Sequence, residues 1–320
     1  MWEFDLPLEK LRTYKPPRTA QPDFDEFWAR TKAEALAQPL NPELKPHDYP
    51  VKRVKVYSAS FDGYAGEGDK PPRVGGWYIV PEEASPRPAL IHYHGYHQFR
   101  HQVVTHLDWA LLGFAVLALD VRGRGEVPDW TEYSGGHALG WMTRGIANKE
   151  EYFYRFAYMD CIRAAELVAQ RPEVDANRIG VLGESQGGGL SLAVAALSDR
   201  PALMMSNVPY LCNYPDAVRM ARSIPFTELN DYFIRYPERE EEAMKTLSYF
   251  DPLNLAPWVT CTTLVSVGLR DITCPPSTVF GVYNHLACEK EIAVYSCDGH
   301  SGGGDAHQEL RVAWAHRLAP

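Results

Sequence analysis

Ser185 has the clearest potential for nucleophilic chemistry, because of the glycines on either side of it. It lies in Gly183-Glu-Ser-Gln-Gly187, after a short apolar run and before the apolar segment 190–197. A serine that attacks a carbonyl must project its hydroxyl from a strained turn between strand and helix, where side chains two residues away would collide. The spacing therefore predicts a nucleophile elbow. The simpler alternative is a glycine-rich turn before a helix.

A serine nucleophile requires a general base, usually a histidine that a carboxylate orients. In the α/β-hydrolase order the acid and then the histidine follow the serine. Asp271 and His300 each come just after a strand-like apolar run. Asp298 also competes for the role of acid, but a residue two positions before His300 on a tight turn can seldom reach its Nδ1 side. We therefore predict Ser185, Asp271 and His300 as the catalytic residues. The alternatives are that Asp271 caps a helix and that His300 is an ordinary loop histidine.

The attack would create a negatively charged oxygen, which needs nearby N–H donors. The backbone N–H of Gln186 is one candidate, since it begins the predicted helix and helix N-termini carry partial positive charge. The second donor should come from the loop after an early strand, where Tyr96 follows Gly95. We predict these two N–H groups as the oxyanion hole.

Other ligand sites are less consistent with the spacing. A metal site is the alternative interpretation of the loop around Tyr96, because five histidines lie in or near it: His92, His94, His97, His101 and His106. No H-E-x-x-H pattern or paired carboxylate accompanies these histidines. The glycines near Ser185 lack the G-x-G-x-x-G spacing of a dinucleotide site, and no phosphate-loop lysine follows them. We expect neither a metal nor a cofactor.

A sheet is needed to hold these residues together. From residue 89 onward short apolar runs alternate with helical segments; the runs are 89–93, 114–119, 179–182, 202–208, 263–267 and 291–295. This alternation predicts an α/β protein with a mostly parallel central sheet and helices on both faces, the α/β-hydrolase fold. The helix before the elbow, 153–170, has Tyr158 and Ile162 on its apolar stripe and Asp160 and Arg163 off it.

The first 80 residues are expected to form elements that flank the central sheet. Residues 1–50 are predicted to form an N-terminal extension, with an amphipathic helix at 24–35. Segments 51–58 and 74–80 predict an antiparallel hairpin at the sheet edge. We expect all of 1–320 to form a single domain.

Two segments are longer than ordinary connections. The glycine-rich segment 120–153 predicts a long loop, and loops of that size are usually functional or disordered. The segment 210–257 contains two predicted helices, 227–236 and 238–249, and is expected to be a helical insertion over the carboxyl edge of the sheet. Its acidic run 238–242 is interpreted as a solvated helix face.

Composition limits the partners. The 320 residues carry a net charge of -9 without a basic run, which argues against nucleic acid. The longest apolar segment, 109–119, is far shorter than the roughly 18–20 residues of a membrane span. The N-terminus shows no secretory pattern, so we expect a cytoplasmic location. The six cysteines lack a C-x-x-C pair and are expected to be reduced and buried: Cys161, Cys212, Cys261, Cys274, Cys288 and Cys297.

Several motifs occur together across the chain. They are His94-Gly-Tyr96, Asp120-Val-Arg-Gly-Arg-Gly125, Arg178-Ile-Gly-Val-Leu-Gly-Glu-Ser-Gln-Gly-Gly-Gly-Leu190, Asp271-Ile-Thr-Cys-Pro-Pro-Ser-Thr278 with Tyr283-Asn-His285, Asp298-Gly-His300, and Pro22-Asp-Phe-Asp-Glu-Phe-Trp28. As a set they resemble the acetyl xylan esterase and cephalosporin C deacetylase family, carbohydrate esterases of the α/β-hydrolase superfamily. The resemblance covers nearly the whole chain.

The resemblance implies a serine esterase that removes acetyl groups from short xylo-oligosaccharides and from cephalosporin C, commonly as a homohexamer. It implies Ser185, Asp271 and His300 as the triad. It also implies that the N–H groups of Tyr96 and Gln186 form the oxyanion hole. Trp109 and Pro225 would line a small acyl pocket. The chain departs from the family pattern at Glu184, Arg124 and 301–304, which leaves substrate preference and assembly open.

Two other function classes remain. A serine peptidase or acyltransferase would use the same triad, and a binding protein could keep the fold without activity. Every triad position is filled, which favours an enzyme over a binding protein.

Overall fold

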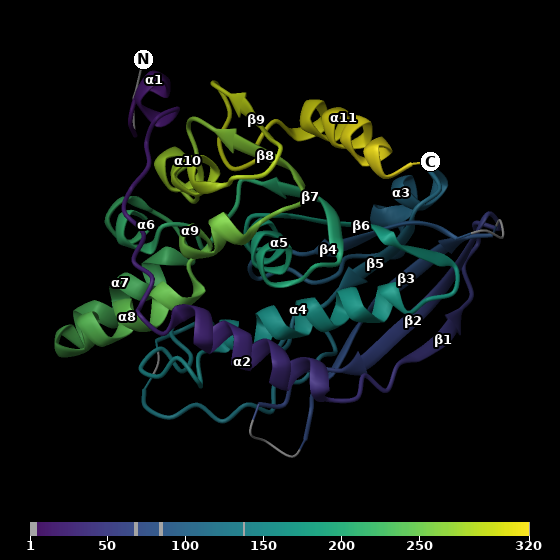
Figure 1. Ribbon diagram of the computed structural model, residues 1–320, viewed down its shortest axis with the longest axis horizontal. Helices are drawn as coiled ribbons and strands as arrows, with labels where there is room; N and C mark the ends of the chain where they lie inside the picture. The colour runs from purple at the N-terminus through teal and green to yellow at the C-terminus, as the bar shows by residue number, and fades with distance from the viewer. Residues whose placement is uncertain (1–4, 67–69, 83–85, 137, 320) are drawn as a thin grey trace.

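A computed structural model of the chain describes residues 5–66, 70–82, 86–136 and 138–319. Its described residues form a nine-stranded sheet in the order β1-β2-β3-β5-β4-β6-β7-β8-β9 (Figure 1). The strands are β1 (Glu43–His47), β2 (Val54–Asp62), β3 (Arg73–Pro81), β4 (Arg87–Tyr93), β5 (Ala115–Leu119), β6 (Val174–Glu184), β7 (Pro201–Asn207), β8 (Thr262–Gly268) and β9 (Lys290–Tyr295). The six strands predicted after residue 88 are therefore all present.

The pairing of the strands confirms a mostly parallel sheet. Strands β4 to β9 pair in parallel, and the pairs β1–β2, β2–β3 and β3–β5 are antiparallel. All five residues of β5 are buried, as expected for a central parallel strand that is covered on both faces. The predicted hairpin is β2–β3, but β1 pairs outside it, so the edge position expected for the hairpin was wrong. Its connection includes 67–69, which lie outside the described residues.

Helices cover both faces of the sheet. One face carries α4 (Phe153–Ala169), α5 (Gln186–Leu197) and α10 (Pro276–His285). The apolar core beneath these helices continues under α2 (Phe24–Ala37). A second core lies on the opposite face, under α3 (Leu107–Leu111) and α11 (Gly304–Ala315). The remaining helices are α1 (Leu8–Leu11), α6 (Tyr214–Met220), α7 (Phe226–Arg235), α8 (Glu240–Phe250), α9 (Pro252–Leu255) and the 3-10 turns η1 (Val103–His106), η2 (Pro237–Arg239), η3 (Ala256–Trp258) and η4 (His316–Leu318).

The predicted N-terminal helix is α2, which runs alongside α4 (Figure 1). Trp28 stacks on Tyr158 of α4 at a ring separation of 5.9 Å. Asp160 and Arg163, which the helical pattern placed on the polar side of α4, are also buried. Asp160 pairs with Arg122 and accepts the Tyr64 N–H. Arg163 donates hydrogen bonds to backbone carbonyls at the end of α2, including Ala35 and Pro39, so its charge helps to fix the N-terminal extension.

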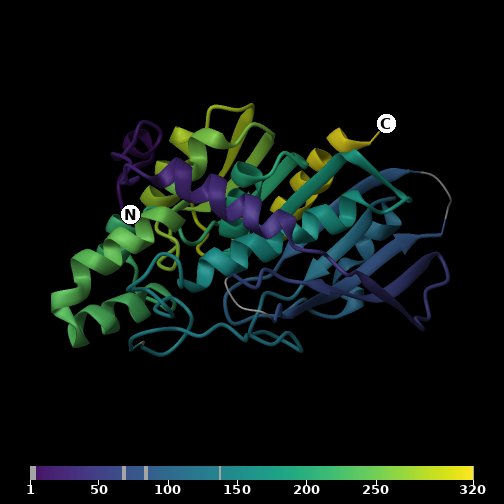
Figure 2. The ribbon, with the colours of Figure 1, turned by 60° about the horizontal axis from the view of Figure 1, so that its bottom comes forward.

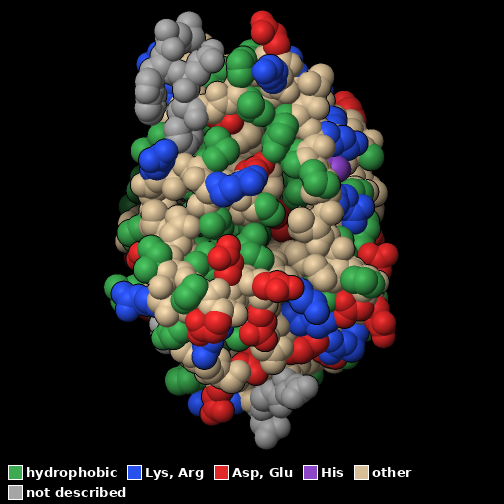
Figure 3. All heavy atoms as spheres, turned by 90° about the vertical axis from the view of Figure 1, so that its left-hand side faces the viewer, with side chains coloured by type: hydrophobic (Ala, Val, Ile, Leu, Met, Phe, Trp, Pro, Cys, Tyr) green, Lys and Arg blue, Asp and Glu red, His purple; other side chains and the backbone are tan. Residues whose placement is uncertain are grey.

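The segment between β7 and β8 contains α6 to α9 and η2 to η3, where two helices were predicted. Figure 2 shows α7 and α8 extending beyond the sheet, on the side away from β1–β3. Figure 3 looks onto this side of the molecule, and acidic and basic side chains mix over its lower half. The acidic residues Glu238, Glu240, Glu241 and Glu242 are exposed, which confirms a solvated face.

Two further expectations concern cysteines and membranes. All six cysteines are free; four are buried, Cys288 is half-buried and Cys297 is exposed, so burial was predicted correctly for four of them. The helices of the described ranges include none long and apolar enough to cross a bilayer. Residues 1–4, where the N-terminal pattern begins, lie outside the described residues.

Candidate active site

Ser185 occupies the turn between β6 and α5, with φ 56° and ψ -117°. Positive φ is costly for a residue with a side chain, so neighbouring structure must hold it. The Ser185 N–H donates to Asn207 O at 3.0 Å, and Ser185 O accepts the Tyr210 N–H at 2.9 Å. The flanking glycines are required: a Cβ at Gly183 would lie 2.4 Å from the carbonyl carbon of Gly187. The geometry is that of the predicted elbow.

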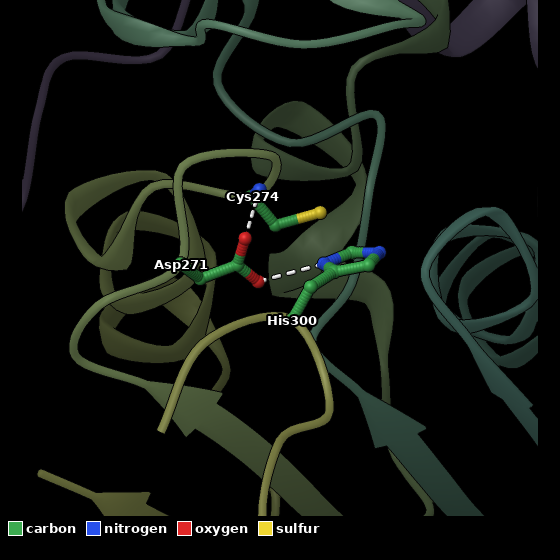
Figure 4. A group of neighbouring side chains, drawn as sticks. All are labelled: Asp271, Cys274 and His300. Atoms are coloured by element: carbon green, nitrogen blue, oxygen red, sulfur yellow. Dashed lines mark hydrogen bonds and ion pairs between the residues drawn. The ribbon is translucent and has the colours of Figure 1, made fainter. Parts of the chain in front are cut away.

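His300 and Asp271 arrive from the carboxyl ends of neighbouring parallel strands. Asp271 follows β8 and His300 follows β9, and His300 Nδ1 lies 2.8 Å from Asp271 Oδ2 (Figure 4). Gly268, the last residue of β8, allows this approach, because a Cβ there would lie 2.1 Å from Gly299 O. The lack of a side chain at Gly268 therefore lets the loops that carry Asp271 and His300 come close enough for their hydrogen bond.

The charge on Asp271 controls the protonation of His300. Burial disfavours the imidazolium, but the hydrogen bond to Asp271 and its negative charge outweigh burial, so the pKa of His300 lies above its usual value. Asp271 is fully buried, and its other oxygen, Oδ1, accepts the N–H groups of Thr273 and Cys274 at 2.8 and 2.9 Å. The carboxylate therefore both orients the histidine and holds the start of its own loop.

Asp298, the competing acid, does not bond to His300. Its carboxylate accepts the N–H groups of Gly299 and Gly303 and the hydroxyl of Ser301. These three bonds fix the turn that carries His300. The sequence argument against Asp298 as the orienting acid agrees with this geometry.

The residues of the two expected oxyanion donors both lie near the nucleophile. Gln186 is the first residue of α5, where N–H groups have no partner within the helix. Tyr96 lines the same cavity as Ser185. The Tyr96 hydroxyl donates to Glu228 Oε2 at 2.8 Å and accepts the Trp141 N–H at 2.7 Å. These bonds join the Tyr96 loop to the long loop and to α7.

His94 is one of the five histidines considered above as metal ligands, and both of its ring nitrogens contact the protein backbone. Burial lowers the pKa of His94 to about 4, and its Nδ1 and Nε2 contact Gly95 O and the Val121 N–H. Within the described ranges, the one group of three ligand-type side chains close enough to share an ion is Asp271, Cys274 and His300. That group is the predicted acid and base beside a thiol whose pKa burial raises (Figure 4). It needs no metal to account for it.

A cavity of about 480 Å³ opens at Ser185. It is lined by Gly95, Tyr96, His97, Gln98, Glu184, Ser185, Ser223, Ile224, Pro225, Thr273 and His300. A larger groove of about 920 Å³, between α2 and α4, contains none of the predicted catalytic residues, so we assign the chemistry to the smaller one. Pro225 lines the cavity as expected.

Trp109 is placed elsewhere, and the expectation that it lines the acyl pocket does not fit this structure. It lies on α3, is only 3% exposed and packs against Phe114 in the second core, on the opposite face from α5. The physical reason is that α3 is short and Trp109 is its one large side chain that is buried, so Trp109 closes that face of the sheet.

Sequence reasoning missed two residues at this site. Glu228 fixes the Tyr96 side chain from a helix in the insertion, and nothing in the local sequence marks it. Glu184 lines the cavity, and it was noted only as a departure from the usual family pattern.

Known proteins are similar to this chain in sequence and in overall fold. The family model for acetyl xylan esterase (AXE1) matches residues 1–318. An acetyl xylan esterase from Paenibacillus sp. R4 superposes with a TM-score of 0.93 at 42% identity, over 98% of this chain and 99% of that one. Acetyl xylan esterase 1 from Thermoanaerobacterium sp. JW/SL YS485 also has a TM-score of 0.93, at 35% identity, over 99% and 100% of the two chains.

A third relative is longer. The acetyl esterase Axe7A of Xylanibacter ruminicola is 27% identical over 297 residues, which make up 89% of this chain but only 64% of that protein. The family model, in contrast, accounts for nearly all of the present chain. This protein, an α/β protein with a mostly parallel sheet, belongs to the acetyl xylan esterase family.

Proposed function

We propose that this protein is a serine esterase that removes acetyl groups from short acetylated xylo-oligosaccharides and similar small esters, cephalosporin C included. The observation that carries the proposal is the strained Ser185 at one cavity with the hydrogen-bonded pair His300–Asp271. Membership of the acetyl xylan esterase family supports the choice of acyl group.

The proposed mechanism uses the contacts of the site. His300 accepts the hydroxyl proton as Ser185 Oγ attacks the acetyl carbonyl, and Asp271 stabilises the imidazolium. The N–H groups of Tyr96 and Gln186 stabilise the oxyanion. His300 then returns the proton to the departing sugar oxygen, which leaves an acetyl group on Ser185. Water repeats the steps and releases acetate.

Ser185→Ala tests the proposal. We expect essentially complete loss of acetyl ester hydrolysis with an unchanged circular dichroism spectrum, because a smaller side chain fits the same turn. Near-native turnover by this variant would refute the triad. The substrates should include an acetylated xylobiose and 4-nitrophenyl acetate, so that loss is seen on both natural-type and activated esters.

A peptidase or acyltransferase would use the same residues, and activity must separate these classes. Hydrolysis of an acetyl ester without cleavage of the matched amide supports the esterase. Transfer of acetyl to an added alcohol in preference to water would favour the acyltransferase. A preference for acetyl over octanoyl esters would support the assignment of Pro225 to a small acyl pocket.

The assembly and location are also proposals. The family resemblance suggests a homohexamer, and we also propose single-domain subunits and a cytoplasmic location. Sedimentation equilibrium of the purified protein should give a mass six times that of the 36.1 kDa chain. A monomer mass would exclude this assembly.

A further inference from the structure

Glu184 is distinctive among the residues around the cavity. It is the last residue of β6, adjacent to Ser185, and its side chain is exposed at the cavity. The other lining residues are uncharged or are histidines, and burial lowers the pKa of His97, which keeps that ring neutral. In the described part of the lining, Glu184 is thus the one carboxyl group. Burial raises its pKa above the usual value, while the positive groups nearby favour its charged form.

The charged groups near Glu184 leave its carboxylate available to a ligand. They are His300, Arg311, Asp271 and His101. Asp271 is engaged with His300, and no ion pair within 4.0 Å joins Glu184 to Arg311 among the described residues. Glu184 therefore lines the same cavity as the attacking Ser185, and that cavity must also hold the alcohol part of an ester.

We infer that Glu184 is a specificity-determining residue that selects, among acetyl esters, those with a neutral or cationic alcohol part and disfavours those that carry an anion near the ester. The preferred class is neutral acetylated sugars over acetylated uronic acids. Cephalosporin C, with a carboxylate close to its acetoxymethyl group, becomes a slower substrate. The inference rests on the proposed function and concerns only its substrate class.

Coulomb's law sets the size of the effect. The repulsion between two like unit charges about 7 Å apart, in an effective dielectric constant of about 40, lowers a binding constant or a rate by about sevenfold. Salt should reduce the effect, because exposed charges are screened. The discrimination should appear mainly in KM, since the repulsion already acts on the bound ester.

The test compares methyl mono-O-acetyl-xyloside with methyl mono-O-acetyl-glucuronoside, whose rings are closely matched apart from the carboxylate. For each protein the readout is the ratio of kcat/KM for the anionic ester to that for the neutral one. Glu184→Gln should raise this ratio by about sevenfold and Glu184→Lys by more. Glu238→Gln, which removes an equal charge from an exposed position outside the cavity lining, should leave it unchanged.

The ratio of kcat/KM for the two esters separates a change in substrate preference from a change in catalysis that affects both esters equally. The negative charge of Glu184 also favours protonation of His300, so Glu184→Gln should move the acid limb of the pH profile to lower pH for both esters equally. An unchanged ratio in Glu184→Gln would overturn the inference, as would an equal change in Glu238→Gln. Activity in Ser185→Ala would instead refute the proposed function, so the two failures are distinguishable.

Discussion

Asp271→Asn is the most informative substitution, because the structure dictates how an asparagine would sit. Oδ1 of Asp271 accepts two backbone N–H groups, from Thr273 and Cys274, so that position must keep an acceptor. The asparagine oxygen takes it, and the amide NH₂ then faces His300 Nδ1. Nδ1 must become an acceptor, which places the ring proton on Nε2. The nitrogen that should take the serine proton is then already protonated.

The expected cost is large in rate and small in stability. The wrong tautomer lowers kcat by about 10⁴, or about 5.5 kcal/mol in activation free energy, on the scale of the serine protease template. The free energy of unfolding should change little, since both backbone hydrogen bonds are kept. We would measure kcat on 4-nitrophenyl acetate, with circular dichroism and thermal unfolding as controls for folding.

Asp298→Asn is the matched control. It alters an aspartate of the loop that carries His300, which supports the turn by three hydrogen bonds but is not hydrogen-bonded to His300. We expect it to lower kcat by about tenfold or less. If Asp298→Asn costs more than Asp271→Asn, or if Asp271→Asn stays within about tenfold of the wild type, the assignment of the acid is wrong.

Three further predictions follow from the same geometry. Tyr96→Phe leaves the Glu228 carboxylate without its hydroxyl donor and loosens the oxyanion loop; kcat should fall by about tenfold with KM nearly unchanged, and a purely KM effect would count against an oxyanion role. The acid limb of kcat/KM against pH should have its midpoint above the ordinary histidine value of about 6.5, because Asp271 raises the pKa of His300 and only the neutral ring acts as base; a midpoint below that value would contradict the pairing. Trp109→Ala should lower the free energy of unfolding by about 3–5 kcal/mol, measured by denaturant titration, while the ratio of kcat/KM for acetyl and hexanoyl esters stays as in the wild type; a changed ratio would return Trp109 to the acyl pocket.

The relation of Glu228 to Tyr96 illustrates what a single sequence does not contain. Glu228 lies in the amphipathic helix α7, 132 positions after Tyr96, and its side chain is buried. No pattern in the sequence reveals this burial, because only the fold brings Glu228 to the Tyr96 hydroxyl. The burial of Asp160 and Arg163 is a similar case. Their spacing places them on the polar side of α4, and distant segments bury them: Arg163 donates to backbone carbonyls at the end of α2, and Asp160 pairs with Arg122.

The sequence by itself determined those features that depend on local sterics and on strand order. Gly183 and Gly187 predict the elbow because only glycine fits beside a strained Ser185, and Asp271 and His300 are found because parallel strands bring their carboxyl ends to one edge. Tertiary structure decided where side chains from distant segments meet: Trp109 in the far core, Glu228 beneath Tyr96, and Glu184 as the charge at the cavity. Such contacts depend on how separate elements pack, and neither periodicity nor spacing within one element encodes that packing.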